Sequence, residues 1–141
     1  MTYVIDTNII SEVLNSNDNR IKERIEKEIL KGEDVFLNAI SYYETKRGLL
    51  ASNASKKLKK FEDFFLKNFE LLMIDSQDIL DIAAKIYAKL KLSGNLNKKG
   101  DADILIAAIT LNKGYTLISN DIDFEKIKSL GFGLLTENWS K

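Results

Sequence analysis

Four carboxylates lie in separate segments of the chain, each beside an apolar run that predicts a buried strand or helix. They are Asp6, Glu44, Asp103 and Asp121. Asp6 ends a run of β-branched and aromatic residues, and Asp121 follows a second such run at residues 115–118. The chain has no His and no Cys, which excludes imidazole and thiol chemistry. Carboxylate oxygens are ligands for hard divalent cations, so the pattern predicts a metal site that activates water.

Alternating apolar patterns predict the elements that must position these acids. Strands are expected at residues 2–5, 35–37, 69–74, 115–119 and 133–135. Helices are expected at residues 9–14, 20–30, 40–51, 56–66, 76–92, 101–112 and 124–130, with a polar loop at 94–100. Strands that alternate with helical crossovers predict an α/β fold whose mostly parallel sheet is covered on both faces. Functional groups gather at the carboxyl ends of such strands, which places Asp6 and Asp121 at one edge.

The two earlier acids each have a structural alternative. Asp6 is a favoured N-cap residue for the helix that begins near Ile9. Glu44 is spaced as the capping-box partner of Ser41, a role that would be purely structural. A cap explains Asp6 alone and leaves the other acids unexplained. The sequence therefore favours a metal site for Asp6 and leaves both readings of Glu44 open.

The two later acids each have an acidic neighbour. Asp101 is the natural N-cap of its helix, and Asp103 is a first-turn acid that the helix dipole favours. Asp103 also directly precedes the buried-looking run ILIAA, where a carboxylate needs a partner or a metal. In the segment SNDIDF, Asp123 is predicted to cap the short helix that follows, which leaves Asp121 for the site.

Composition bounds the class of protein. The 141 residues are expected to form a single domain, residues 1–141. The 21 basic and 21 acidic residues cancel, which argues against binding driven by bulk positive charge but allows local basic patches. Without Cys, disulfides and thiolate metal sites are excluded. The start MTYVIDTN lacks the features of a signal peptide, and no stretch approaches the ~18 apolar residues that span a membrane, so a cytoplasmic location is expected.

Five segments of the chain together resemble a known family. In order they are DTNIIS, ISYYETKRGL, DADILIAA, TLISNDIDF and the pair Asn138-Trp139. Each is weak alone, but the ordered set covers essentially the whole chain and is similar to the PIN domain, most of all to the VapC toxins of toxin–antitoxin pairs. The resemblance implies a three-layer α/β/α sandwich around a parallel sheet. It also implies an endoribonuclease that hydrolyses RNA with Mg²⁺ or Mn²⁺.

The resemblance assigns roles to residues of this chain. The catalytic, metal-binding acids fall on Asp6, Glu44, Asp103 and Asp121. Asn8 matches a polar residue that supports the first acid, and Ser119 takes the accompanying hydroxyl position. Asp101 is an extra acid that leaves the third position open between itself and Asp103. The candidates for contacts with RNA phosphates are Lys46, Arg47, Lys98 and Lys99.

The resemblance also implies partners, namely an RNA substrate such as tRNA or rRNA, a VapB-like antitoxin and a second copy of the chain. Two apolar clusters support the homodimer, because they contain more apolar side chains than the burial of one helix face needs. The clusters are Ile21, Ile25 and Ile29, and Phe61, Phe64 and Phe65. Their alternative use is an ordinary core.

Three other functions are compatible with part of the pattern. A phosphohydrolase of the haloacid dehalogenase type also has an Asp after its first strand, but it needs a second acid two residues on, where this chain has Asn8. A non-catalytic interaction domain would use the acids as caps. A PIN nuclease of RNA processing would share the site but lack an antitoxin.

Overall fold

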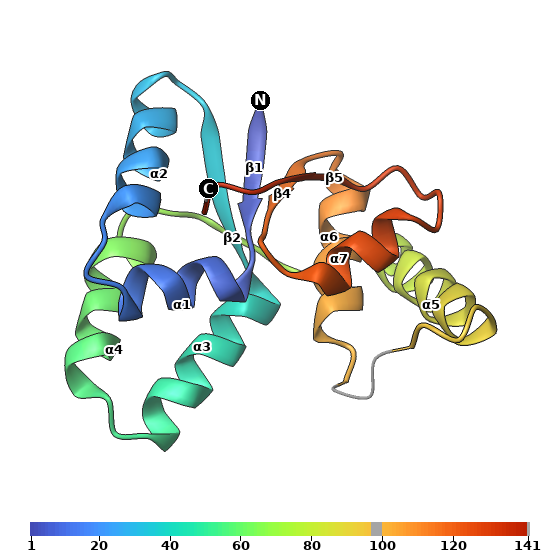
Figure 1. The fold of residues 1–141 in the computed structure, drawn as a ribbon, viewed down its shortest axis with the longest axis horizontal. Helices are drawn as coiled ribbons and strands as arrows, with labels where there is room; N and C mark the ends of the chain where they lie inside the picture. The colour runs from blue at the N-terminus through green and yellow to red at the C-terminus, as the bar shows by residue number, and fades with distance from the viewer. Residues whose placement is uncertain (97–99, 141) are drawn as a thin grey trace.

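The computed structural model describes residues 1–96 and 100–140 (Figure 1). Its strands are β1 (Thr2–Ile5), β2 (Asp34–Asn38), β3 (Leu71–Leu72), β4 (Thr116–Ile118) and β5 (Leu135–Glu137). Its helices are α1 (Thr7–Asn15), α2 (Arg20–Leu30), α3 (Ala39–Ala51), α4 (Ser55–Phe61), α5 (Gln77–Leu92), α6 (Ala102–Lys113) and α7 (Ile122–Lys128), with a π-helical segment, η1 (Glu62–Leu66), after α4. In these ranges no helix has both the length and the apolar character needed to cross a membrane.

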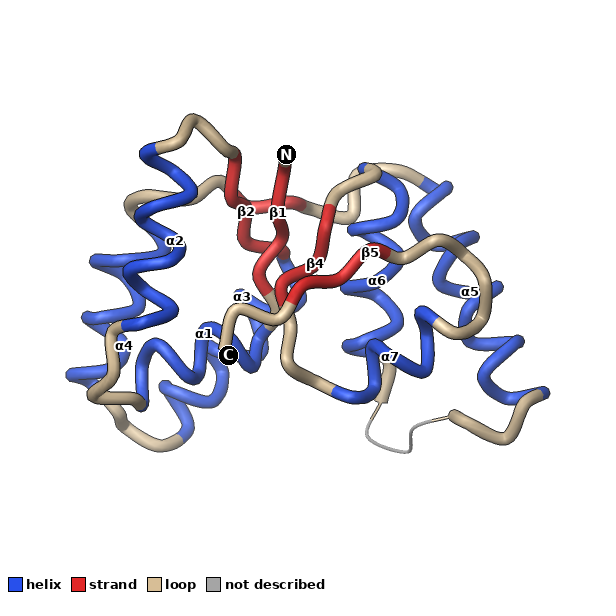
Figure 2. Tube along the Cα trace, turned by 45° about the horizontal axis from the view of Figure 1, so that its top comes forward, coloured by secondary structure: helices blue, strands red, loops and turns tan. Residues whose placement is uncertain are grey.

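The described strands form one parallel sheet in the order β3-β2-β1-β4-β5. β1 lies at its centre, with Tyr3 in register with Val35 of β2 and with Thr116 of β4. Figure 2 shows the strands between two groups of helices, α1–α4 on one side and α5–α7 on the other. The predicted α/β fold, a three-layer sandwich around a parallel sheet, is confirmed.

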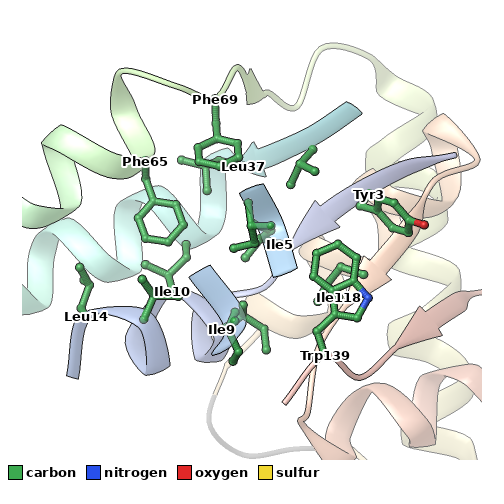
Figure 3. Packing of buried hydrophobic residues seen from close by; sticks show 14 of the residues in the cluster. Tyr3, Ile5, Ile9, Ile10, Leu14, Leu37, Phe65, Phe69, Ile118 and Trp139 are labelled. Carbon is green, nitrogen blue, oxygen red and sulfur yellow. The ribbon is translucent and has the colours of Figure 1, made fainter. Parts of the chain in front are cut away.

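Side chains of the central strand alternate between two separate cores, as the pleat of a strand requires. Tyr3 and Ile5 pack with the helices on the α1–α4 side and form the first core with them. Val4 packs with α5, α6 and α7 in the second core. Figure 3 shows Ile5, Ile10 and Phe65 within the first core. Each fully buried side chain of this kind contributes about 1.5–3 kcal/mol. These two cores hold the carboxyl edge of β1 and β4 in place.

The two edge strands differ from the prediction. β3 pairs only Leu71 and Leu72, whereas a strand was expected over residues 69–74. The amide of Phe69 donates to the carbonyl oxygen of Phe65 at 3.1 Å, so the chain is still turning there. β5 begins at Leu135 rather than at residue 133, because Gly133 has a φ of 87°, a left-handed conformation that ends an extended run.

The helix predicted over residues 56–66 is also divided. α4 ends at Phe61, and the following turn is wider, with the amide of Lys67 donating to the carbonyl oxygen of Glu62 at 3.2 Å. Phe61 and Phe65 are both fully buried across this change of pitch. The aromatic cluster of this segment is thus part of the first core.

Candidate active site

Asp6 stands at the carboxyl end of β1 and is 2% exposed. Its amide continues the sheet by donating to the carbonyl oxygen of Ile118 at 3.2 Å. Its Oδ1 accepts the amide of Asn8 at 2.8 Å and so caps α1, while its Oδ2 accepts the hydroxyl of Ser119. Asp6 can therefore be both a helix cap and an acid of a metal site. The cap uses Oδ1, and Oδ2 is held at the sheet edge.

The turn after β4 brings Asp121 to the same edge. The amide of Asp121 donates to Ser119 Oγ at 3.0 Å, and Asn8 Nδ2 donates to Asp121 Oδ2 at 3.0 Å. Asp121 Oδ1 accepts the amide of Asp123 at 3.0 Å, so Asp121 is the N-cap of α7. The prediction that Asp123 caps this helix is wrong, because the helix begins at Ile122. Asn8 and Ser119 each form hydrogen bonds with both Asp6 and Asp121, and their supporting roles in catalysis stay predictions.

The C-terminal residues brace this turn from the other side. Asn120 Nδ2 donates to Glu12 Oε2 of α1 at 3.0 Å, and the hydroxyl of Ser140 donates to the same oxygen at 2.9 Å. The ring of Trp139 is buried against Tyr3 of β1, with ring centroids 4.9 Å apart. Trp139 of the late Asn-Trp pair thus belongs to packing at the sheet edge, whereas Asn138 is exposed.

Glu44 projects from α3 toward the loop after β1. The hydroxyl of Thr7 donates to Glu44 Oε1 at 2.7 Å and shares a hydrogen bond of 2.9 Å with the hydroxyl of Ser41. Of the two readings left open for Glu44, the capping box with Ser41 does not form, because α3 begins at Ala39 and Asn38 Oδ1 accepts the amide of Ser41. Glu44 is therefore held by Thr7 of α1 and not by its own helix start.

Asn38 is a site residue that the sequence did not reveal. It is fully buried, and its Nδ2 donates to the carbonyl oxygen of Ile5 at 3.0 Å and to Ser41 Oγ at 2.9 Å. It links the ends of β1 and β2 beneath Thr7. A polar residue at the end of an apolar strand run was the signal for it.

Asp103 lies in the first turn of α6, and its carboxylate joins those of the β4–α7 turn. Among the described residues, one oxygen each from Asp103, Asp121 and Asp123 lies within 4.8 Å of the other two. Asp101 is exposed and makes no capping hydrogen bond with the described part of the chain. The structure thus brings Asp103, and not Asp101, to the acids after β4. Asp123 was missed because a capping role had been assigned to it.

Two of these acids have pKa values displaced toward neutrality. Burial raises the pKa of Asp103 to about 7, and the negative charges of Asp121, Asp6, Asp123 and Glu44 add to the increase. Burial also raises the pKa of Asp6 to about 6, against the hydrogen bonds from Ser119 and the amide of Asn8, which lower it. Both carboxylates are thus costly to ionise when no cation is near.

These residues fit a hard divalent cation. Such ions take oxygen ligands at about 2.0–2.6 Å, which three carboxylate oxygens within 4.8 Å of one another can supply. Acids that repel one another and resist ionisation are stabilised by a positive charge between them. Asp6 and Glu44 contribute to the same negative field from the neighbouring loop and helix. Their roles as direct ligands stay predictions.

A family model for the PIN domain matches residues 3–130 of this chain. The chain belongs to the PIN-domain family. The resemblance found in its motifs is thereby confirmed, and the family consists of nucleases. A comparison with curated protein sequences found no match.

Solved structures share the PIN fold over the whole chain. A chain of VapBC2 from Rickettsia felis, bound to a DNA fragment from its promoter, matches with a TM-score of 0.80, 23% identity and coverage of 99% of this chain and 100% of that chain. DNA-bound VapBC from Salmonella typhimurium gives a TM-score of 0.82 at 23% identity, covering 99% and 98%. VapBC-1 from nontypeable Haemophilus influenzae gives 0.77 at 23% identity, covering 100% of both chains. At these identities the likeness shows the fold.

The basic residues predicted for RNA binding have different surroundings in this PIN domain. Lys46 donates to the hydroxyl of Tyr42 at 3.1 Å. Arg47 lies over the ring of Tyr43, 5.1 Å from its centroid, and its Nη2 is 3.9 Å from Glu44 Oε2. Of the two predicted cations that the structure describes, Arg47 is the one that lies beside an acid of the site. Lys98 and Lys99 lie outside the described residues.

Ser119→Ala should shift the titration of Asp6. The Ser119 hydroxyl donates to the Asp6 carboxylate and lowers its pKa, so its loss should raise that pKa above about 6. NMR titration of the Asp6 carboxyl carbon in metal-free protein measures this. Ser129→Ala, at an exposed position on the far end of α7, is the control. An unchanged or lower Asp6 pKa in Ser119→Ala would contradict the arrangement.

Proposed function

We propose that this protein is a Mg²⁺- or Mn²⁺-dependent endoribonuclease and the toxin of a VapBC-type toxin–antitoxin pair. The observation that carries the proposal is the convergence of acids from β1, α3, α6 and the β4–α7 turn at one edge of a PIN-domain sheet. Family membership supports nuclease chemistry, and the likeness to chains of VapBC complexes supports the toxin.

The site residues would have different roles in phosphodiester hydrolysis. Asp6, Glu44, Asp103 and Asp121 are the proposed metal ligands, and Asp123 would join Asp103 and Asp121. The metal ion, when bound, would lower the pKa of water and neutralise phosphate charge. Thr7 holds one oxygen of Glu44, and the other oxygen would bind the ion or its water. Arg47, beside Glu44, would contact a phosphate oxygen. Asp6 sets the position of both loops through its hydrogen bonds with Asn8 and Ser119.

The partners follow from the same proposal. A VapB-like antitoxin would neutralise the activity, the RNA would be a tRNA or rRNA, and the protein would act in the cytoplasm as a single domain over residues 1–141. The homodimer is also proposed, although most of the two apolar clusters is part of the core. Ile21, Ile25, Phe61 and Phe65 are buried in the core, and Ile29 is the member of the two clusters that is clearly exposed, at 41%.

RNA cleavage by the purified protein is the test of the proposal. Labelled structured RNA should be cut internally in Mg²⁺ or Mn²⁺ and left intact in excess chelator, because the acids need a cation to bind the phosphate. Expression of the chain should arrest growth, and co-expression of the small neighbouring gene product should restore it. Intact RNA under all metal conditions, or cleavage that chelator does not affect, would contradict the nuclease assignment.

The alternatives are separated by the same experiments. A PIN nuclease of RNA processing would cleave RNA but would not arrest growth or require a neighbouring antitoxin. A haloacid dehalogenase is disfavoured because the chain belongs to the PIN family and Asn8 donates to Asp121 instead of supplying a second acid. A non-catalytic domain would leave RNA intact with any metal.

A further inference from the structure

A groove of about 270 Å³ runs from the candidate active site between α1 and α3 to the start of α4. Thr7 and Glu44, which belong to the site, also line one end of the groove. Lys57 of α4 lines it as well. α1, α3 and α4 contact one another along this side of the molecule (Figure 1). The groove therefore meets the candidate active site at Thr7 and Glu44.

The wall of the groove contains a hydroxyl that lacks a partner. Thr45 is 9% exposed and lines the groove, and its Oγ1 has no hydrogen-bond partner among residues 1–96 and 100–140. Buried polar groups are nearly always paired, and an unpaired one costs free energy. Thr45 follows Glu44 directly in α3. A ligand that lies in the groove and reaches the acids can supply the missing hydrogen bond.

Gly48 keeps the groove open. It lines the groove within α3, and a Cβ placed on it would meet no atom within 4 Å. Its backbone is helical, so an added Cβ would enter open space without backbone strain. The position offers a way to fill the groove without disturbing the core.

The charge along the groove changes sign. It begins at Glu44, the acid among its lining residues, and extends to Lys57 on α4. On the same helix, Lys59 pairs with Asp63 at 3.5 Å and Lys60 donates to the carbonyl oxygen of Val13 at 3.3 Å. Lys57 is the α4 lysine that lines the groove. A second positive group at one end suits a chain with regularly spaced phosphates.

We propose that this groove binds the RNA nucleotide adjacent to the cleaved phosphodiester, with the Thr45 hydroxyl contacting its base or ribose and Lys57 contacting the next phosphate. Thr45 is then a specificity-determining residue. The inference rests on the proposed ribonuclease function. Its occupant is single-stranded RNA, and a protein segment in the same place is an outcome that the tests distinguish.

Lys57→Ala tests the phosphate contact against Lys56→Ala, a neighbouring exposed lysine outside the groove. KM for an oligoribonucleotide longer than the cleaved pair should rise several-fold in Lys57→Ala, with kcat affected much less. The slope of log KM against log salt should fall by about 0.7, the value for one phosphate of a single strand. Lys56→Ala should match the wild type in both measurements. Equal behaviour of the two variants would overturn the phosphate contact.

Gly48→Leu and Thr45→Val test the groove itself. Gly48→Leu should raise KM for the long oligoribonucleotide by tenfold or more while the melting temperature is maintained, and Gly48→Ala should have a much smaller effect. Thr45→Val should change which nucleotide is preferred beside the cut when a random RNA pool is cleaved and sequenced. Thr136→Val, a hydroxyl loss on β5, should keep the wild-type preference.

The outcomes separate this inference from the proposed function. If the wild type cleaves no RNA, both fail. If it cleaves RNA and all groove variants keep its KM and sequence preference, the groove inference alone is overturned. If the variants cleave like the wild type but escape neutralisation by a co-expressed antitoxin, the groove holds that protein instead, which also overturns the inference.

Discussion

Replacing Asp103 with asparagine is expected to reduce kcat for RNA cleavage by about 10³-fold, or about 4 kcal/mol of transition-state stabilisation. The negative charges of the other four acids of the site all raise the pKa of Asp103. One of its oxygens also belongs to the group of three carboxylates that fits a cation. Asparagine keeps the shape of the side chain but removes its charge. Single-turnover cleavage with saturating Mn²⁺ measures the effect.

Asp101→Asn is the matched control, because Asp101 is an exposed acid two residues earlier. It should retain activity within a few-fold of the wild type. Metal-free Asp103→Asn should also be at least as stable as the wild type above pH 7, since it removes a carboxylate that burial and four acids disfavour. Full activity in Asp103→Asn would remove Asp103 from the site, and loss of activity in Asp101→Asn alone would transfer the third position to Asp101.

Metal binding is expected to stabilise the fold, and to do so most strongly at neutral pH. A metal ion at ~100 times its dissociation constant should add about 2.7 kcal/mol, because it binds the folded site and hardly the unfolded chain. Thermal unfolding in Mg²⁺ or Mn²⁺ against chelator, at pH 5 and pH 7.5, measures this. Asp103→Asn should lose most of the gain, and Asp101→Asn should keep it.

The sign of the pH dependence follows from the two raised pKa values. Folding raises the pKa of Asp6 from 3.8 to about 6 and that of Asp103 from 3.8 to about 7, so the metal-free folded state binds protons more tightly than the unfolded chain. Without metal, the stability contributed by these groups is present below about pH 4 and is lost as pH rises to about 7. Metal requires the ionised forms, so its stabilisation grows over the same range.

Two results would contradict this account of the cluster. A melting temperature that does not respond to millimolar metal at pH 7.5 would mean that the acids do not bind a cation before RNA arrives. A metal-free protein that becomes more stable as pH rises from 5 to 7.5 would mean that Asp6 and Asp103 do not have raised pKa values.

The architecture could be predicted from the sequence because it depends on local patterns. Strand-like runs that alternate with helical runs dictate a parallel sheet covered on both faces, and Tyr3, Val4 and Ile5 point alternately into the two cores. The carboxyl ends of parallel strands share one edge, so the sequence predicts that Asp6 and Asp121 lie together. The PIN-domain resemblance rested on the same ordered segments and is confirmed.

The tertiary structure decided which side chain does what at that edge. Spacing alone could not choose between Asp121 and Asp123 as the cap of α7, because a shift of two residues in the helix start exchanges their roles. Asn8 and Asp121, or Ser119 and Asp6, are 113 residues apart, and only the register of β1 against β4 brings them within hydrogen-bond distance.

The same holds for the contacts between helices. Thr7 reaches Glu44 because α1 and α3 leave neighbouring strands side by side, and no local pattern relates residues 7 and 44. The unpaired hydroxyl of Thr45 likewise becomes visible only when the groove between those helices is formed. Local periodicity thus determined the elements and the edge at which the acids meet. Strand register and helix packing, which depend on residues far apart in the chain, decided the hydrogen bonds, the raised pKa values and the groove beside them.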